Sequence, residues 1–341
     1  MRGIASILVV LLHISIKWKQ FGDSAFGEIP VGGSGVDLFF IISGYIMCFS
    51  TDGRQLNFFQ FMGLRIRRIM PFYWLTTTIG LAVFLYNPGL VNSSGGKTSI
   101  WASYVLVPTG AKYLNANGWT LSFEFFFYLI FALFIHRGTD KAMRYSSIIL
   151  LMLVALGPFF MTRGFGLNFL TNNMYLEFVG GMGCFYLFNR KGARFGAGYG
   201  IALCLIAVML FVAEQLAQVA PPGTWRGFCW GIPMLLLFAG LLSLEGPIRR
   251  SSSAVKTIFL GIGDSSYSLY LIHPFALSGI ARCLKHFNAV SNPKLFVVAL
   301  LIPTIVAGHL AYLYIERPLT AFVKKVFTPS RPRPETSKLT R

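Results

Sequence analysis

The chain alternates between long apolar stretches and short polar segments from one end to the other. Each apolar stretch has roughly 17 to 23 residues, about the length that an α-helix needs to cross the hydrocarbon core of a bilayer. The pattern predicts an all-α, polytopic integral membrane bundle of about ten transmembrane helices. They are expected at about 3–20, 33–50, 70–87, 118–136, 145–162, 174–189, 197–217, 228–245, 264–284 and 295–315.

The segments outside these spans complete a simple organisation. The stretch 99–110 is too short to span and is interpreted as a re-entrant or interfacial piece. The tail 328–341 is basic and rich in proline, which is typical of a disordered segment. The sequence therefore predicts one membrane domain, residues 1–327, followed by a tail in the cytoplasm.

Positive charges fall mainly on one side of the predicted bundle. If the chain starts in the cytoplasm, most of its 30 Lys and Arg residues lie in cytoplasmic segments and in the tail. Because Lys and Arg are retained on the cytoplasmic side of short loops, this bias predicts that both termini are cytoplasmic. The apolar run after Arg2 lacks a small-residue cleavage pattern, so it is interpreted as a retained first span and not as a signal peptide.

Composition supports a membrane protein and argues against several other classes. Hydrophobic residues make up 55% of the 341 residues and charged residues only 12%, which is too apolar for an ordinary soluble domain. The net charge of +18 is spread over short loops beside apolar spans, so membrane lipid is the expected partner and nucleic acid is not. The five cysteines lack the spacing of metal ligands. We expect no metal site and no permanently bound cofactor.

The first span carries an ionisable residue at a depth where hydrocarbon offers it no water. His13 follows Arg2 by eleven residues, which advance a helix by three turns plus about 20°. The two side chains therefore share one helix face, with Arg2 at the cytoplasmic mouth and His13 near mid-membrane. An ionisable residue at this depth indicates a functional site. A topology anchor and a hydrogen-bonded structural histidine explain the same pair equally well.

Two further segments supply charged groups for such a site. Arg65 and Arg68 are three residues apart at the cytoplasmic end of the third span, on one face if that segment is helical. Guanidinium groups bind phosphates, so these arginines predict an anionic ligand, while a plain topology signal is the alternative. Glu124 lies among phenylalanines in the fourth span. A buried carboxylate needs a partner, and we expect it to pair with His13, whose imidazole it would orient as a general base, or with an arginine.

Five other polar residues are weaker candidates. Asp37 lies near the outer start of the second span, and Glu177 lies within the sixth. His273 precedes Pro274, so it marks a local break in helix hydrogen bonding that fits a bend as well as a ligand site. His309 lies near mid-depth of the last span, and Glu316 closes that span and is interpreted as a cytoplasmic cap or gate. We expect a structural role for all five.

Six segments together resemble the membrane-bound acyltransferase 3 family, and most of all its exopolysaccharide-modifying acetyltransferases. They run in the family's order over nearly the whole chain, and together they are specific although each is weak alone. The matching pieces are Arg2 with ten residues before His13, GVDLFFIISGYIM at 35–47, RIRRIMPFYWL at 65–75, the Trp119 to Glu124 segment, SYSLYLIHPF at 266–275 and IERP at 315–318.

This resemblance implies a ten-helix membrane enzyme of the bacterial inner membrane that transfers an acyl group, usually acetyl from acetyl-CoA, to a carbohydrate hydroxyl. It implies that Arg2 and His13 belong to the active centre and that Arg65 and Arg68 handle coenzyme A. Glu124 carries over as the family's membrane carboxylate. Trp119, in the matching segment, is a candidate for a substrate-binding or structural role, and polysaccharide synthesis or export proteins are candidate partners. Members of the family usually have a few residues before the segment that begins here at Arg2.

Two mechanisms fit these residues. In the first, His13 removes the proton of the sugar hydroxyl as it attacks the acetyl thioester, while Glu124 orients the imidazole. In the second, His13 itself carries the acetyl group across the bilayer. A transporter or flippase for a polysaccharide intermediate is an alternative function, although the sequence shows no transporter-like repeats. A non-catalytic subunit of a polysaccharide synthase is another.

Overall fold

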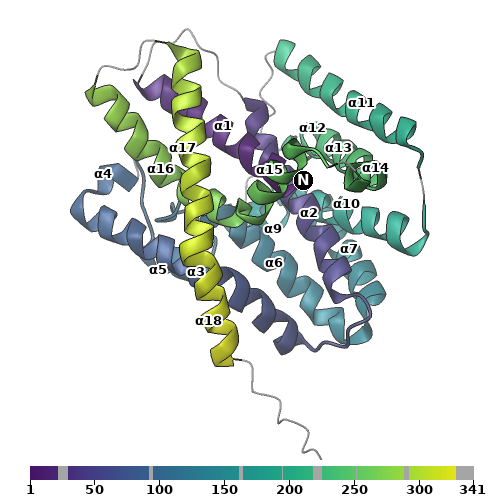
Figure 1. Cartoon of the computed structure of the whole chain (residues 1–341). Helices are drawn as coiled ribbons and strands as arrows, with labels where there is room; N and C mark the ends of the chain where they lie inside the picture. Colours follow the sequence, from purple (N-terminus) through teal and green to yellow (C-terminus); the bar gives the residue numbers. More distant parts are fainter. Residues whose placement is uncertain are drawn as a thin grey trace, which may run out of the picture.

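The computed structural model describes residues 1–21, 30–91, 95–160, 164–193, 195–217, 225–250, 252–287 and 292–327. Within these ranges the chain forms a bundle of helices, with no strand and only one isolated bridge, between Thr98 and Lys112 (Figure 1). The predicted all-α class is therefore confirmed. The tail 328–341 lies outside the described residues.

The helices follow one another along the chain with short connections. The first half contains α1 (Arg2–Phe21), η1 (Pro30–Gly33), α2 (Ser34–Thr51), α3 (Phe58–Tyr86), α4 (Pro88–Val91), α5 (Ile100–Val105), α6 (Gly118–Phe134), η2 (Ile135–Arg137), α7 (Thr139–Ala155), α8 (Gly157–Phe160) and α9 (Phe165–Leu170). The second half contains α10 (Tyr175–Phe185), η3 (Tyr186–Arg190), α11 (Ala197–Leu216), α12 (Arg226–Cys229), α13 (Gly231–Ser243), α14 (Glu245–Arg250), α15 (Ala254–Asp264), α16 (Ser266–His286), α17 (Pro293–Ala311), η4 (Tyr312–Glu316) and α18 (Arg317–Phe327).

Seven helical segments within the described ranges are long and apolar enough to cross a membrane. They are Arg2–Gln20, Val31–Thr51, Phe58–Tyr86, Gly118–Arg137, Ala197–Leu216, Arg226–Ser243 and Pro293–Phe327. The other three predicted spans coincide with α7, with α10 and η3, and with α16, which are shorter or more polar. The chain is thus a polytopic helical bundle, while the count of ten spans stays a prediction.

The third span starts earlier than its apolar pattern indicates. We expected it to begin near residue 70, but α3 begins at Phe58. The side chain of Asn57 accepts a hydrogen bond from the backbone N–H of Gln60, and the Gln60 side chain accepts one from the N–H of Asn57. This reciprocal cap starts the helix in the polar segment. Arg65 and Arg68 therefore lie on a regular helix that continues into the bundle.

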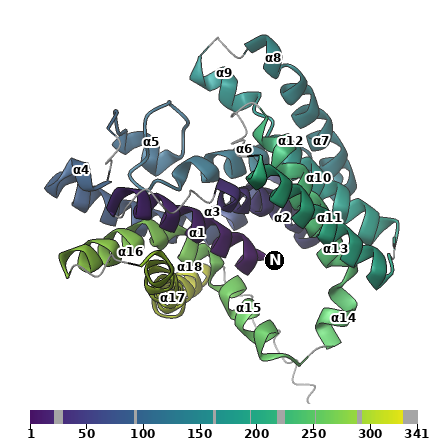
Figure 2. The ribbon, with the colours of Figure 1, turned by 90° about the horizontal axis from the view of Figure 1, so that it is seen from above.

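Helix α2 lies in the middle of the bundle, between α1 and α10 (Figure 2). Two glycines let α2 and α10 approach closely: a Cβ on Gly44 would lie 2.2 Å from the carbonyl oxygen of Phe178, and one on Gly181 would lie 2.0 Å from that of Ile41. Small residues at such a crossing are typical of membrane bundles. The most apolar window of α2 is 78% buried, against 11% for α11, which lies at the periphery.

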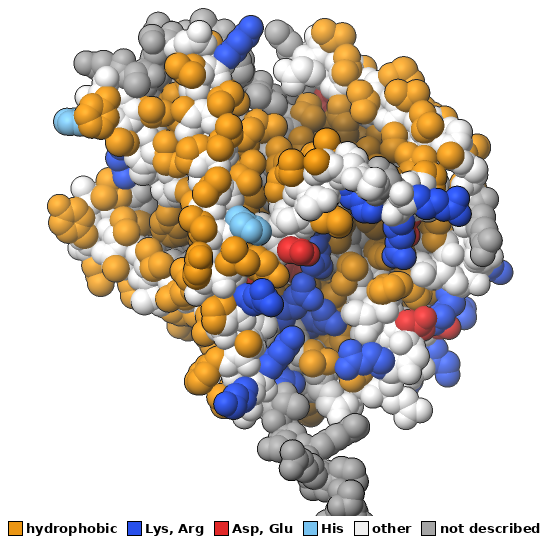
Figure 3. Space-filling model, viewed as in Figure 1, with side chains coloured by type: hydrophobic (Ala, Val, Ile, Leu, Met, Phe, Trp, Pro, Cys, Tyr) orange, Lys and Arg blue, Asp and Glu red, His pale blue; other side chains and the backbone are white. Residues whose placement is uncertain are grey.

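The surface is uneven in its chemistry. On the face seen in Figure 3, hydrophobic side chains dominate the upper and left parts, and most of the visible Lys and Arg side chains lie in the central and lower parts. The lower part holds α18 and the start of α3 (Figure 1). The charge bias along the sequence predicts that this end faces the cytoplasm, and the orientation stays a prediction.

Candidate functional site

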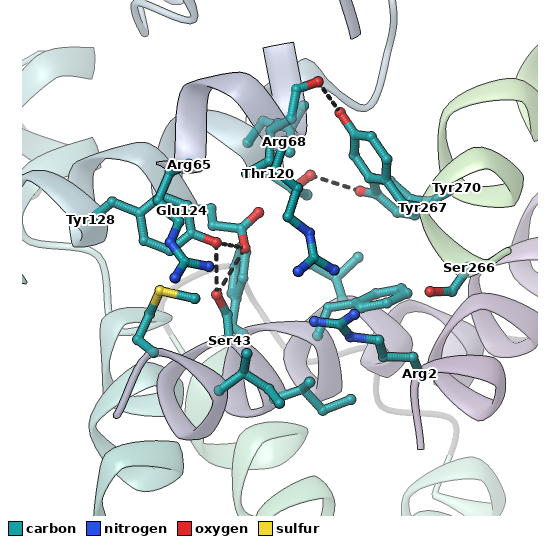
Figure 4. Close-up of a pocket in the computed structure, with 18 residues that line it drawn as sticks. Arg2, Ser43, Arg65, Arg68, Thr120, Glu124, Tyr128, Ser266, Tyr267 and Tyr270 are labelled. Carbon is teal, nitrogen blue, oxygen red and sulfur yellow. Dashed lines mark hydrogen bonds between the residues drawn. The ribbon is translucent and has the colours of Figure 1, made fainter. Parts of the chain in front are cut away.

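A cavity of about 110 Å³ lies among α1, α2, α3, α6 and α16. Its walls combine aromatic and aliphatic side chains with a smaller set of polar ones, as is common for ligand sites. Figure 4 labels the polar and tyrosine side chains that line it, which are Arg2, Ser43, Arg65, Arg68, Thr120, Glu124, Tyr128, Ser266, Tyr267 and Tyr270. The cavity therefore brings together four charged residues that sequence analysis singled out: Arg2, Arg65, Arg68 and Glu124.

The three arginines enter the cavity from two helices. Figure 4 shows the guanidinium groups of Arg2 and Arg68 pointing toward one another, with Arg65 beside Glu124. Arg65 donates from Nη2 to the hydroxyl of Ser50 over 3.0 Å, but its buried Nε has no hydrogen-bond partner within the described ranges. Its guanidinium also lies 5.2 Å from the ring centre of Phe61 and 6.0 Å from that of Tyr128.

Two carboxyl groups lie near these arginines without a direct ion pair: Glu124 interacts electrostatically with Arg2 and Arg65, and Glu316 with Arg68 and Arg2. Among the residues that the structure describes, none of Arg2, Arg65 and Arg68 forms an ion pair with a carboxylate. Like charges held together in a partly apolar cavity repel one another, and an anion that enters the cavity relieves this repulsion. The geometry therefore suits a ligand that carries phosphate or carboxylate groups.

Glu124 is held by hydroxyl groups. It accepts a hydrogen bond from Ser43 over 2.8 Å and a second, short one from Tyr128, one helical turn further along α6. The expected contact with His13 is not among the contacts of either side chain in the described part of the chain. His13 lies three turns beyond Arg2 on α1 and does not line the cavity. Glu124 is therefore close to the arginines and not to the imidazole that we expected it to orient.

His13 pairs instead with His273, which comes from α16. The ring centres lie 4.7 Å apart, and the planes are inclined by 67°. His13 Nδ1 lies 2.9 Å from the carbonyl oxygen of Val9. Because that carbonyl only accepts, Nδ1 carries the hydrogen, which leaves the lone pair of the neutral ring on Nε2. His13 thus has the tautomer that lets Nε2 accept a proton.

Pro274 interrupts the backbone hydrogen bonding of α16 directly after His273. Pro274 has no N–H to donate to the carbonyl of Tyr270, four residues earlier, and that carbonyl instead accepts a short hydrogen bond from the side-chain amide of Asn117. The Asn115 amide donates to the neighbouring carbonyl of Leu271 over 3.3 Å. Two buried amides just before α6 therefore satisfy the backbone beside Pro274.

Tyr270 connects the cavity with the histidine pair. Its side chain lines the cavity, its ring centre lies 5.9 Å from that of His273, and its hydroxyl lies 2.8 Å from the hydroxyl of Thr120. Tyr270 thus lies between the arginine cavity and the histidine pair, whose rings do not line the cavity.

Asp37 is more deeply buried than we expected for a residue near the outer interface. Its side chain is fully buried and forms an ion pair of 3.0 Å with Arg226, whose side chain is 22% exposed. Arg226 also donates to the carbonyl of Gly33 over 3.0 Å. Glu177, 3% exposed, lies beside Asp37. Sequence analysis did not connect Arg226 with these carboxyls, although a buried carboxylate requires a cation or proton donor.

Trp119 and Glu316 lie at opposite ends of the described site. The Trp119 ring lines a second cavity of about 340 Å³, whose other walls come from α9 and nearby segments, and its centre lies 5.8 Å from the Arg226 guanidinium. Glu316 accepts a hydrogen bond of 2.5 Å from Ser268 and so joins the end of η4 to the start of α16. This contact agrees with the structural role expected for Glu316.

Comparison with known proteins gives a consistent result. The description of an acyltransferase domain matches residues 1–313. The chain is 32% identical over 310 residues to the exopolysaccharide production protein ExoZ of Rhizobium meliloti (strain 1021), covering 86% of this chain and 90% of the relative. It is 25% identical to the acyltransferase MdmB of Streptomyces mycarofaciens, covering 93% of this chain and 89% of the relative.

A third relative is longer than this chain. The peptidoglycan O-acetyltransferase OatA of Listeria monocytogenes serovar 1/2a (strain ATCC BAA-679 / EGD-e) is 23% identical, and the match covers 94% of this chain but 54% of OatA. No solved structure matches the chain. The match over residues 1–313 and the similarity to ExoZ confirm the family that the motifs indicated: the chain belongs to the acyltransferase domain family and is a multi-pass membrane acyltransferase.

Proposed function

We propose that this acyltransferase moves an acetyl group from acetyl-CoA to a hydroxyl of a cell-surface carbohydrate, such as an exopolysaccharide or its lipid-linked precursor, at the bacterial inner membrane. The names of two relatives support the class of acceptor and the group transferred, since one is an exopolysaccharide production protein and another a peptidoglycan O-acetyltransferase. The observation that carries the proposal is the cavity that gathers three arginines and a single carboxylate, next to a tyrosine whose ring lies beside a pair of imidazoles.

The arginine cavity suits the donor. Coenzyme A carries a diphosphate and a 3′-phosphate, and guanidinium groups bind such oxygens through charge-assisted hydrogen bonds. Arg68 is exposed and Arg65 is buried, so the pair offers charge both at the mouth of the cavity and further inside. If the phosphates bind at the mouth of the cavity, the narrow pantetheine chain of acetyl-CoA would extend past Tyr270 and bring its thioester toward the histidines.

The tautomer of His13 suits proton removal from the acceptor. Its Nε2 takes the proton of the sugar hydroxyl as the oxygen attacks the thioester carbonyl, a C–O bond forms, and the C–S bond breaks. The departing coenzyme A sulfur then takes the proton from Nε2. The acyl-histidine route uses the same nitrogen as a nucleophile, and the geometry of His13 serves either route.

In this proposal Glu124 balances the charge of the arginines and does not orient His13, which was the role expected from the sequence. It lies among three guanidinium groups and accepts hydrogen bonds from Ser43 and Tyr128. Its negative charge offsets part of their repulsion, and the hydroxyls hold it at the cavity wall. Glu124 therefore sets the charge of the donor site and does not orient the imidazole.

Acetyl transfer by isolated membranes tests the function. Membranes that contain the protein are incubated with radiolabelled acetyl-CoA and de-O-acetylated polysaccharide of the same strain, and label in the polymer is counted. We expect transfer with the wild type and none with His13→Ala. His286→Ala is the matched control, because His286 lies exposed at the end of α16 and should transfer normally.

The outcomes separate the alternatives. Transfer by His13→Ala, in membranes with the same amount of protein as the wild type, would remove His13 from the reaction. Wild-type membranes that leave the polymer unlabelled would contradict the proposed donor or acceptor. If that result came with altered export of the polymer in a deletion strain, a transport role would replace the proposal.

A further inference from the structure

Both imidazoles of the histidine pair use the same nitrogen in the same way. His273 Nδ1 lies 3.3 Å from the carbonyl oxygen of Leu269, and His13 Nδ1 lies 2.9 Å from that of Val9; each carbonyl is four residues earlier on the same helix. Each carbonyl accepts the Nδ1–H of its ring, so each neutral ring has its lone pair on Nε2. The site therefore contains two proton acceptors side by side.

The Nε2 of His273 is an acceptor without a donor. The residue is fully buried, and among the described residues this atom has no hydrogen-bond partner. Leaving a buried polar atom unpaired costs the free energy of its lost hydration. Buried polar atoms are rarely left unpaired, and functional sites are among the places where this occurs.

A hydrogen-bond donor for Nε2 of His273 forms during the reaction, when His13 becomes protonated. In its resting tautomer His13 has one N–H, which is engaged by Val9. When His13 accepts a proton on Nε2, a second N–H is created on a ring whose centre lies 4.7 Å from that of His273. A small side-chain rotation then lets this N–H donate to the free Nε2 of His273.

We propose that His273 is a positioning residue for acyl transfer, whose Nε2 accepts a hydrogen bond from protonated His13 and so stabilises the charge that develops on His13. The inference rests on the proposed function. An acceptor that is already in place when charge develops stabilises the transition state more than the ground state. The proton itself stays on His13 until the coenzyme A sulfur takes it, so His273 changes neither its bonds nor its protonation.

The surroundings of Pro274 support this assignment. The Asn117 amide donates to the carbonyl of Tyr270, which lacks the N–H of residue 274, and the Asn115 amide donates to the carbonyl of Leu271, so both amides join this part of α16 to the segment before α6. His273 lies one turn from Tyr270, whose ring lines the donor cavity. A histidine that only filled space would not need its free nitrogen beside His13.

Three variants at this position separate the proposed role from packing. Because the amide of glutamine reaches the position of Nε2 whereas that of asparagine reaches only that of Nδ1, His273→Gln restores an acceptor near His13 and His273→Asn does not. His273→Phe keeps a ring but removes both nitrogens. Replacing an unpaired buried atom with an apolar one is close to neutral for folding, so His273→Phe should remain stable.

The measurement is acetyl transfer from radiolabelled acetyl-CoA to de-O-acetylated polysaccharide in membranes, with kcat and KM for acetyl-CoA determined separately. We expect kcat to fall about 10- to 100-fold in His273→Asn and His273→Phe with KM changed less than about threefold, because the lost interaction forms only in the transition state. His273→Gln should recover kcat to within about fivefold of the wild type. Melting temperatures in detergent should stay within a few degrees of the wild type.

Each other result overturns the inference. Wild-type kcat in His273→Asn would show that the free nitrogen is not used. An equal loss of kcat in His273→Gln and His273→Asn, with unchanged melting temperatures, would assign the effect to ring shape and not to the acceptor. A loss of kcat that accompanies unfolding in all three variants would mark His273 as structural. If wild-type membranes transfer no acetyl group, the proposed function fails first and the inference falls with it; a wild-type signal with unaffected variants overturns the inference alone.

Discussion

Two charged clusters lie within this bundle, and they differ in how their arginines are balanced. On the side expected to face outward, Arg226 forms an ion pair with the buried Asp37 and lies near Glu177. At the other end, Arg2, Arg65 and Arg68 surround one cavity with a single carboxylate, Glu124, which bonds to hydroxyls. In the first cluster an arginine forms an ion pair with a carboxylate, whereas in the second no arginine does so among the described residues.

From this difference we expect the Arg226 cluster to stabilise the fold and the arginine cavity to bind a ligand. Arg226 joins α12 to the start of α2, and the rings of Trp230 and Trp119 lie 4.7 and 5.8 Å from its guanidinium. Removing it should mainly affect the fold. Among the described residues, the arginines of the cavity form no ion pair that joins helices, so removing them should mainly affect ligand binding. Charges gathered in a cavity without an ion pair are candidates for ligand binding.

Arg226→Gln should have the largest effect on stability. It leaves Asp37 and Glu177 buried without their cation, and breaking a buried pair in this way costs about 3–5 kcal/mol. Unfolding in mixed micelles measures the loss. The matched control is Arg249→Gln, because the pair of Arg249 with Glu245 is exposed (78% and 50%), and it should change stability by less than about 1 kcal/mol. Equal losses in the two variants would show that the outer cluster is no more than a surface contact.

The double variant Arg65→Gln with Arg68→Gln should weaken acetyl-CoA binding by about 100-fold, since each hydrogen bond to a charged group contributes roughly 1.5–3 kcal/mol and the two are only partly additive. Its melting temperature should hardly change. Binding of radiolabelled acetyl-CoA to the purified protein checks this. Arg67→Gln is the control on the same helix, because Arg67 donates to the carbonyls of Gly63 and Phe327. Unchanged affinity in the double variant would assign these arginines to membrane topology.

Glu124→Gln should have a smaller effect that depends on the donor. Glutamine still accepts from Ser43 and Tyr128, but the three guanidinium groups lose their nearby negative charge. We expect a loss of about 1 kcal/mol, or roughly 2–4 °C in melting temperature, that disappears with saturating acetyl-CoA. Glu214→Gln is the control, because Glu214 accepts from Trp230 outside the cavity and should not respond to the donor. A loss that persists with acetyl-CoA would contradict a charge-balancing role.

Arg190→Gln should have the smallest effect, although Arg190 also faces two carboxylates. It pairs with Asp52 over 2.5 Å and with Asp140 over 2.7 Å, and these hydrogen bonds raise the pKa of Arg190 further above its ordinary value. The carboxylates are 37% and 63% exposed, so water replaces most of what is lost, and we expect about 1 kcal/mol or less. Unfolding in mixed micelles, run beside Arg226→Gln, tests whether burial makes the difference. A similar loss in both variants would contradict it.

Much of the fold could be predicted from local pattern. Apolar runs of spanning length placed every long helix, because a membrane helix must satisfy its backbone within itself and present apolar side chains all around. The start of α3 could not be placed in this way, since it depends on the cap between Asn57 and Gln60 in a polar segment. The arginines and Glu124 were found as charges in apolar surroundings, and the structure gathers them in one cavity.

The sequence by itself determined the membrane class, the family and the residues whose presence in hydrocarbon requires an explanation. Tertiary structure alone decided their partners. It placed His273 beside His13, Arg226 beside Asp37, and Ser43 and Tyr128 beside Glu124, although most of these residues lie far apart in the chain. The physical reason is that helix period fixes which face a residue occupies, while the choice of neighbouring helix depends on contacts such as the glycines of α2 and α10 and the interruption at Pro274.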